Sequence, residues 1–177
     1  MHESIKIPTT DAHTFCRLEP RIRLDYAQVE SDKRICNHID AVNYLCSKIR
    51  DLPQESTFAI FLDGRLTPLG YCCVGQGTQS VCTISVAKII QVATLAAANG
   101  IILIHNHPDM KEPSASSLDV ACAHRIAAVL KEIDGMILYD SVIVSCDTST
   151  KLYSMREDGK LEDLPSYQDL IRASNRT

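Results

Sequence analysis

The stretch Ile101-Ile102-Leu103-Ile104-His105-Asn106-His107 is the most informative part of this chain. An apolar run rich in β-branched residues predicts a buried strand, and two histidines stand at its end. Because side chains alternate along a strand, His105 and His107 are expected to point to the same face. The pattern therefore predicts two imidazole rings side by side at the end of a buried strand.

A helix is predicted soon after this strand, over residues 117–134. Ser116 stands at its start and Asp119 in its first turn, so the helix can bring Asp119 back over the strand end. Two imidazoles and one carboxylate would hold zinc with one tetrahedral position open, as catalytic sites do. Another interpretation stays open, in which the histidines are ordinary polar groups and Asp119 is half of a helix cap. A cap does not exclude ligation, since the helix dipole favours a carboxylate in the first turn.

Apolar periodicity predicts the other elements of the domain. Helical stripes are expected over residues 37–50 and from Ser85 through Ala97, with Asn99-Gly100 as a stop signal. Further strands are expected over residues 57–62, 69–74, 136–145 and 152–156. Strands and helices that mix without regular alternation predict an α/β or α+β fold, with helices packed on one sheet.

Length and composition indicate one enzyme-sized domain inside the cell. The 177 residues, 45% of them hydrophobic, can bury one substantial core. No signal peptide and no apolar stretch of the ~20 residues needed to span a bilayer is recognisable. No Cys-x-x-Cys pair occurs, so free thiols in a reducing compartment, the cytoplasm, are expected of the eight cysteines at positions 16, 36, 46, 72, 73, 82, 122 and 146.

The charge of the chain does not favour a nucleic-acid partner. Its formal net charge is −4 and its pI about 5.8, whereas binding to phosphates requires a basic face. The one basic cluster, Arg17, Arg21 and Arg23, is interrupted by Glu19 and Asp25. We interpret it as a solvated segment.

The residues around the histidine strand resemble a known motif. His105-Asn106-His107-Pro108, then Glu112-Pro113-Ser114, Ser116 and Asp119, are similar to the JAMM motif of the JAB/MPN metallopeptidases, in the form found in the RadC family. The likeness extends over about residues 36–162, with residues 1–35 as an N-terminal segment and 163–177 as a C-terminal tail. It implies a JAB/MPN-like (cytidine-deaminase-like) mixed sheet flanked by helices.

The resemblance also implies a chemistry and a set of roles. Zinc (Zn²⁺) held by His105, His107 and Asp119 would lower the pKa of its bound water toward ~7. Glu55, just before the first core strand, matches the family's general base, and Ser116 would donate a hydrogen bond to the oxyanion or cap its helix. The implied activity is zinc-dependent hydrolysis of peptide or isopeptide bonds in a peptide or protein substrate.

The chain departs from the family pattern at several positions. The loop between the histidines and Ser116 is one residue longer, around residues 109–111, and Val86-Ala87-Lys88 replaces the usual Pro-Arg-Glu. Ser141 replaces a histidine after Asp140, and residues 1–35 are too short for the helix-hairpin-helix region of full-length RadC proteins. These departures are expected to leave the ligand set intact.

Several alternatives remain open at this point. Glu112 in the ligand loop competes with Glu55 as the base, whereas His124 is expected to be structural. The domain could instead be a non-catalytic partner-binding module or a protein associated with DNA repair. In the tail, Tyr167, Leu170 and Ile171 have helical spacing, and residues 22–26 alternate as an edge strand would.

Overall fold

A computed structural model describes residues 33–49, 52–78, 81–108, 110–133, 136–145, 151–161 and 167–174 of the chain. The expected edge strand over residues 22–26 and the basic cluster around Arg21 lie outside these residues.

One mixed sheet organises the described part of the chain. Six strands of that part lie in the order β3-β2-β1-β4-β5-β6. Their bounds are β1 Ser56–Leu62, β2 Pro68–Thr78, β3 Val81–Ile84, β4 Gly100–His107, β5 Ile137–Ser145 and β6 Leu152–Ser154. Neighbouring strands are antiparallel except β4 and β5, which are parallel and therefore need a crossover connection. The helix α3, Ser117–Lys131, lies in that crossover, and the mixed sheet confirms the predicted fold class.

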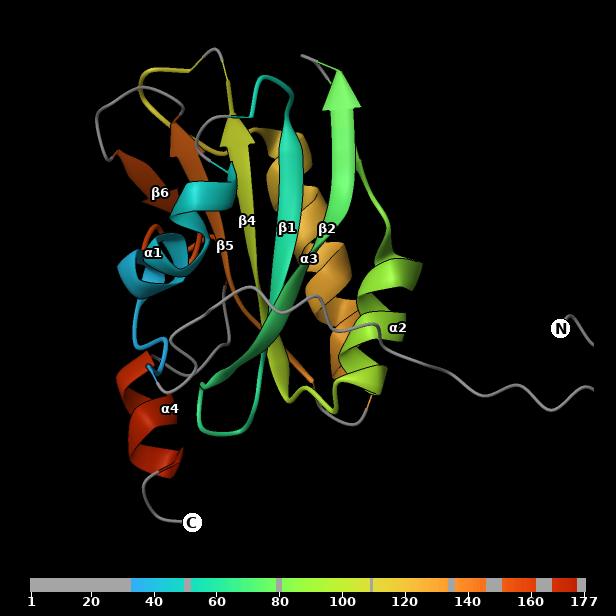
Figure 1. Cartoon of the computed structure of the whole chain (residues 1–177), viewed down its shortest axis with the longest axis vertical. Helices are drawn as coiled ribbons and strands as arrows, with labels where there is room; N and C mark the ends of the chain where they lie inside the picture. The colour runs from blue at the N-terminus through green and yellow to red at the C-terminus, as the bar shows by residue number, and fades with distance from the viewer. Residues whose placement is uncertain are drawn as a thin grey trace, which may run out of the picture.

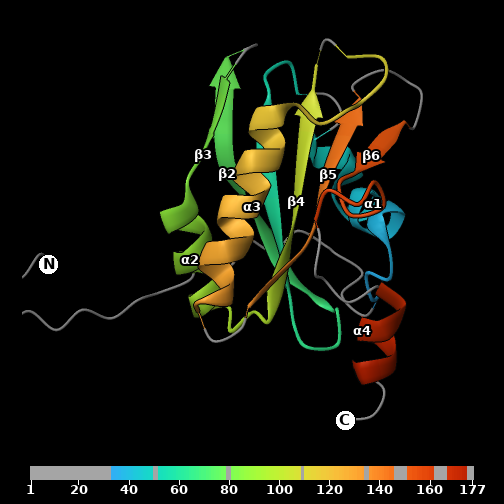
Figure 2. The ribbon, with the colours of Figure 1, turned by 180° about the vertical axis from the view of Figure 1, so that it is seen from behind.

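Helices cover both faces of the sheet and create two hydrophobic cores. Figure 1 shows α1 (His38–Ile49) in front of the sheet, and Figure 2 shows α3 in front of the opposite face. The helix α2, Val86–Leu95, packs in the same core as α3, whereas α4, Tyr167–Ser174, packs in the core of α1. No helix among the described residues is both long enough and apolar enough to cross a membrane.

The strand β4 lies at the centre of the sheet and supplies both cores. Ile101 and Leu103 pack on the side of α2 and α3, and Ile102 and Ile104 pack on the side of α1. All four side chains are almost completely buried. A strand that is covered on both faces has a continuous run of apolar residues, which explains why residues 101–104 are all apolar.

The edge of the sheet differs from the prediction. The strand β3 was not predicted, and β2 continues to Thr78, beyond the predicted end at residue 74. Gly75 and Gly77 weaken the strand signal because glycine has low β-propensity. Pairing of these glycines with Ile84 and Cys82 of β3 supplies the hydrogen bonds that keep this part extended.

The end of α2 also differs from the prediction. The helix stops at Leu95, so Ala97 lies beyond the helix and not in its apolar stripe. Ala97 has a φ of 51°, in the left-handed region, and Ala98 N–H donates to the carbonyl of Ala93. Such a bond satisfies a carbonyl group that has no partner within the helix, and glycine usually occupies the left-handed position. Because alanine occupies the left-handed position here, the apolar pattern of the sequence continues beyond Leu95, where α2 ends.

The helical spacing expected in the tail is confirmed by α4. Its first residue, Tyr167, is 6% exposed and packs in the core of α1. The guanidinium of Arg156 lies over its ring, 4.7 Å from the centroid. A cation over an aromatic face is a stabilising arrangement, so α4 is docked by packing and electrostatics together.

Gly100 generates a test of the packing around β4. A Cβ at this position would lie 2.5 Å from Cε2 of Tyr139 and 2.6 Å from the carbonyl oxygen of Ile137. Gly100→Ala should therefore lower the free energy of unfolding by about 1–3 kcal/mol, measured by urea denaturation. Gly64→Ala is the control, because its new Cβ would be 3.5 Å from the nearest atom of Asn99. Equal stability of the two variants would contradict this packing.

Candidate metal centre

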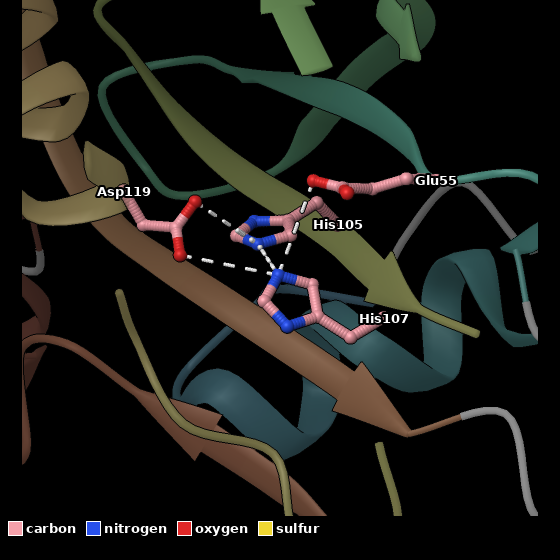
Figure 3. Close-up of side chains that lie close together, drawn as sticks. All are labelled: Glu55, His105, His107 and Asp119. Carbon is pink, nitrogen blue, oxygen red and sulfur yellow. Dashed lines mark hydrogen bonds and ion pairs between the residues drawn. The ribbon is translucent and has the colours of Figure 1, made fainter. Parts of the chain in front are cut away.

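Four side chains that can bind a metal meet at the carboxyl end of β4 (Figure 3). They are Glu55, His105, His107 and Asp119, and one donor atom from each lies within 4.8 Å of the other three. The two imidazoles come from β4, the carboxylate of Glu55 from the residue before β1, and that of Asp119 from the first turn of α3.

The sheet register explains why Glu55 lies beside the histidines. The strands β1 and β4 are antiparallel, and Thr57 pairs with His105. Glu55 precedes Thr57 by two residues, and His107 follows His105 by two residues. In an antiparallel pair these two positions lie opposite each other, so Glu55 lies next to His107. The crossover helix α3 begins at the same end of the sheet, so Asp119 approaches from the other side.

The distances among the donor atoms suit a zinc-sized ion. His105 Nε2 lies 2.8 Å from His107 Nε2 and 3.6 Å from Asp119 Oδ1. His107 Nε2 lies 3.9 Å from Asp119 Oδ2 and 4.0 Å from Glu55 Oε1. Tetrahedral ligands at zinc–ligand bond lengths are separated by roughly 3.3 Å, which falls within this spread. The residues present therefore fit the metal that the motif implies.

Burial keeps His105 in the form that binds metals. The side chain is 4% exposed, and its pKa is lowered to about 4, mainly by burial; Asp119 opposes this shift and His107 adds to it. A neutral imidazole offers a lone pair, which is the ligand form of histidine. The Nδ1 atom of His107 lies 2.7 Å from the sulfur of Met110, which leaves Nε2 to face the cluster.

Asp119 takes part in a helix cap and in the cluster at the same time. Its Oδ2 accepts hydrogen bonds from the backbone N–H and the hydroxyl of Ser116, at 2.8 and 2.7 Å. The backbone N–H of Asp119 donates to the Ser116 hydroxyl in return, which completes a capping box. Meanwhile Oδ1 is turned toward His105. Capping and metal ligation are therefore compatible, and the cap holds the carboxylate in place.

The hydroxyl of Ser116 has a clear structural role. It donates to Asp119 and accepts from the Asp119 backbone, so it orients a carboxylate of the cluster. Its bond to a reaction oxyanion stays a prediction.

The carboxyl group of Glu55 lies in a partly buried environment that favours a base. Burial raises its pKa above the ordinary value, while His107 lowers the pKa and Asp119 raises it. A carboxylate with a raised pKa accepts a proton more readily near neutral pH. Its environment therefore suits the role that the sequence resemblance implied.

The competing acid and the other titratable candidates lie elsewhere. Glu112 is 76% exposed and forms an ion pair with Lys151, and it does not belong to the metal-type cluster found among the described residues. His124 Nε2 lies 2.5 Å from the carbonyl of Lys160, which agrees with a structural role. Among the described side chains, Cys36, Cys72, Cys73 and Cys122 are free thiols.

Comparisons with known proteins identify the family of this chain. The family model described as the RadC-like JAB domain matches residues 35–160. UPF0758 protein lpl2409 of Legionella pneumophila (strain Lens) is 25% identical over 169 residues, covering 87% of this chain and 72% of the relative. A UPF0758 protein of Thermotoga maritima is 33% identical over 116 residues, covering 66% of this chain and 50% of the relative. The chain therefore belongs to the RadC-like JAB domain family.

Proposed function

We propose that this domain is a zinc-dependent hydrolase of peptide or isopeptide bonds. The observation that carries the proposal is the convergence of two imidazoles and two carboxylates within 4.8 Å at one end of β4. Three of these groups, His105, His107 and Asp119, would hold the metal and leave a position for water. Such an open position is typical of catalytic zinc.

The electrostatics of the cluster support a divalent cation as its natural occupant. Two carboxylates and two imidazoles bring their donor atoms within 4.8 Å of one another in a partly buried site. Like charges at such distances repel unless a cation or protons lie among them. The low pKa of His105 disfavours a proton there, so a metal ion is the better partner for these donors.

The remaining chemistry belongs to the residues of the chain. When bound, zinc would supply a Lewis acid that acidifies a coordinated water toward a pKa of ~7. Glu55 would take the proton from this water and return it to the leaving amine, because its carboxylate lies beside His107 without being needed as the third ligand. Ser116 would keep Asp119 oriented through the capping box. The substrate class is an amide, in a peptide or between a side chain and a peptide.

Zinc content is the first test of this proposal. The purified protein should contain about one zinc per chain, and His107→Ala should lose it because two remaining ligands bind zinc weakly. The measurement is elemental analysis after dialysis against metal-free buffer. His124→Ala is the control, since His124 contacts Lys160 and not the cluster. Full zinc occupancy in a His105→Ala, His107→Ala double variant would refute the site.

The role of Glu55 is tested by removing its basicity and keeping its shape. Glu55→Gln should lower hydrolysis by about 10²- to 10⁴-fold, with zinc content and fold unchanged. A peptide library and a matched set of lysine ε-linked peptides serve as substrates. Glu112→Gln should change the rate by less than about twofold, because exposed ion pairs contribute little.

Each outcome of that experiment has a distinct meaning. Wild-type activity in Glu55→Gln would remove Glu55 as the base, and loss of activity in Glu112→Gln would then assign the role to Glu112. A protein that binds zinc and cleaves neither substrate set would instead favour the non-catalytic binding module.

The capping box generates a prediction for Ser116. Ser116→Ala should cost about 1 kcal/mol of folding stability through the lost cap. It should also weaken zinc binding by about 10- to 100-fold, because Asp119 loses the hydroxyl that donates to its Oδ2. Ser117→Ala is the control, since this exposed neighbour begins α3 without forming the box. Unchanged zinc affinity in Ser116→Ala, measured by competition with a chelator, would show that the cap does not support the ligand.

A further inference from the structure

Asn106 stands between the two histidines of β4 and is completely buried, at 0% exposure. Because side chains alternate along a strand, its carboxamide points away from the face that carries the imidazoles. It lies on the side of Ile104, in the direction of the core of α1. A buried carboxamide is expected to be held by hydrogen bonds, and those of Asn106 lead to one segment of the chain.

Three hydrogen bonds join the Asn106 side chain to the backbone on both sides of Glu55. Its Oδ1 accepts from the N–H of Ser56 at 2.8 Å. Its Nδ2 donates to the carbonyls of Leu52 and Gln54, both at 3.1 Å. These partners define the orientation of the amide, since the reversed amide would place donor against donor and acceptor against acceptor.

These bonds act where the backbone pairing of the sheet ends. Pairing between β1 and β4 runs from Leu62 with Gly100 to Thr57 with His105, two residues before Glu55 is reached. The Asn106 side chain continues the connection from β4 to the residues on either side of Glu55. From the other neighbour strand, Gly77 N–H donates to the carbonyl of Glu55 at 3.0 Å.

We infer that Asn106 is a positioning residue for Glu55, which joins the backbone of the general base to the strand that carries both histidines. The inference rests on the proposed function. The strand β4 then positions both kinds of group. His105 and His107 present the imidazoles, and Asn106 between them positions the carboxylate of Glu55. Catalytic groups must be held within about 0.5 Å of their productive positions, and a misplacement of about 1 Å can cost 10²-fold in rate.

The side chain of Asn106 is distinct from the metal ligands in both contacts and direction. Its carboxamide contacts the segment of Glu55 and faces away from the imidazole side of the strand. Loss of the carboxamide should therefore release Glu55 and leave the imidazoles and Asp119 able to hold zinc.

Amide hydrogen exchange tests the anchoring without any metal or substrate. In Asn106→Ala, and in Asn106→Ser if the alanine variant does not fold, the Ser56 amide should exchange at least about tenfold faster relative to the Ile60 amide. Taking this ratio removes any change in global stability, because global unfolding exposes both amides alike. Ile104→Val is the matched control on the same face of β4, and it should leave the ratio unchanged. An unchanged ratio in the Asn106 variants would refute the anchoring.

Kinetics of the zinc-loaded protein test the consequence for catalysis. In the Asn106 variants kcat should fall at least about tenfold, with zinc content unchanged and KM within about twofold, whereas Ile104→Val should keep the wild-type values. A wild-type kcat in variants that have lost Ser56 protection would refute the positioning role. Loss of zinc would refute it too, by showing that Asn106 supports the ligands. If the wild-type protein itself lacks hydrolysis, the proposed function and the catalytic part of this inference both fail, and exchange still decides the anchoring.

Discussion

The antiparallel pairing of β1 with β4 is the interaction on which the site depends. It places Thr57 against His105, so the segment before β1 arrives at the end of the histidine strand. A slip of one residue would turn every side chain of β4 to the opposite face and move the imidazoles into the core of α1. Burial on both faces makes such a slip costly, because Ile101 to Ile104 fill two different cores. The packing that stabilises the sheet therefore also defines the geometry of the metal centre.

The parallel pairing of β4 with β5 supplies the fourth member of the cluster. Parallel neighbours require a crossover, and α3 makes it from the same end of the sheet at which the histidines stand. Its capping box with Ser116 uses one oxygen of Asp119 and leaves the other turned toward His105. One helix start thus meets two demands, the satisfaction of orphan backbone groups and the placement of a carboxylate.

The departures from the RadC pattern lie outside the donor set. Val86-Ala87-Lys88 begins α2, where the Lys88 backbone N–H donates to the Ser85 hydroxyl as an ordinary cap. Ser141 is buried beside Asp140, whose carboxylate accepts bonds from the Ser154 hydroxyl and two backbone N–H groups and ties β5 to β6. Neither segment contributes a donor atom to the cluster of His105, His107, Asp119 and Glu55.

The local features could be predicted from the sequence alone: the histidine strand with its alternation, the helix start at Ser116 and the motif of the family. These depend on residues a few positions apart, so periodicity and capping signals reveal them. The assignment of Glu55 came only from the resemblance, because its contact with His107 spans about fifty residues. The strand β3, the end of α2 at a left-handed Ala97 and the anchoring by Asn106 were decided by the tertiary structure. The strand β3 and the anchoring depend on pairing or burial between distant segments, which overrules the weak local preferences of glycine and asparagine. The end of α2 depends on an alanine in the left-handed conformation, which its residue type does not signal.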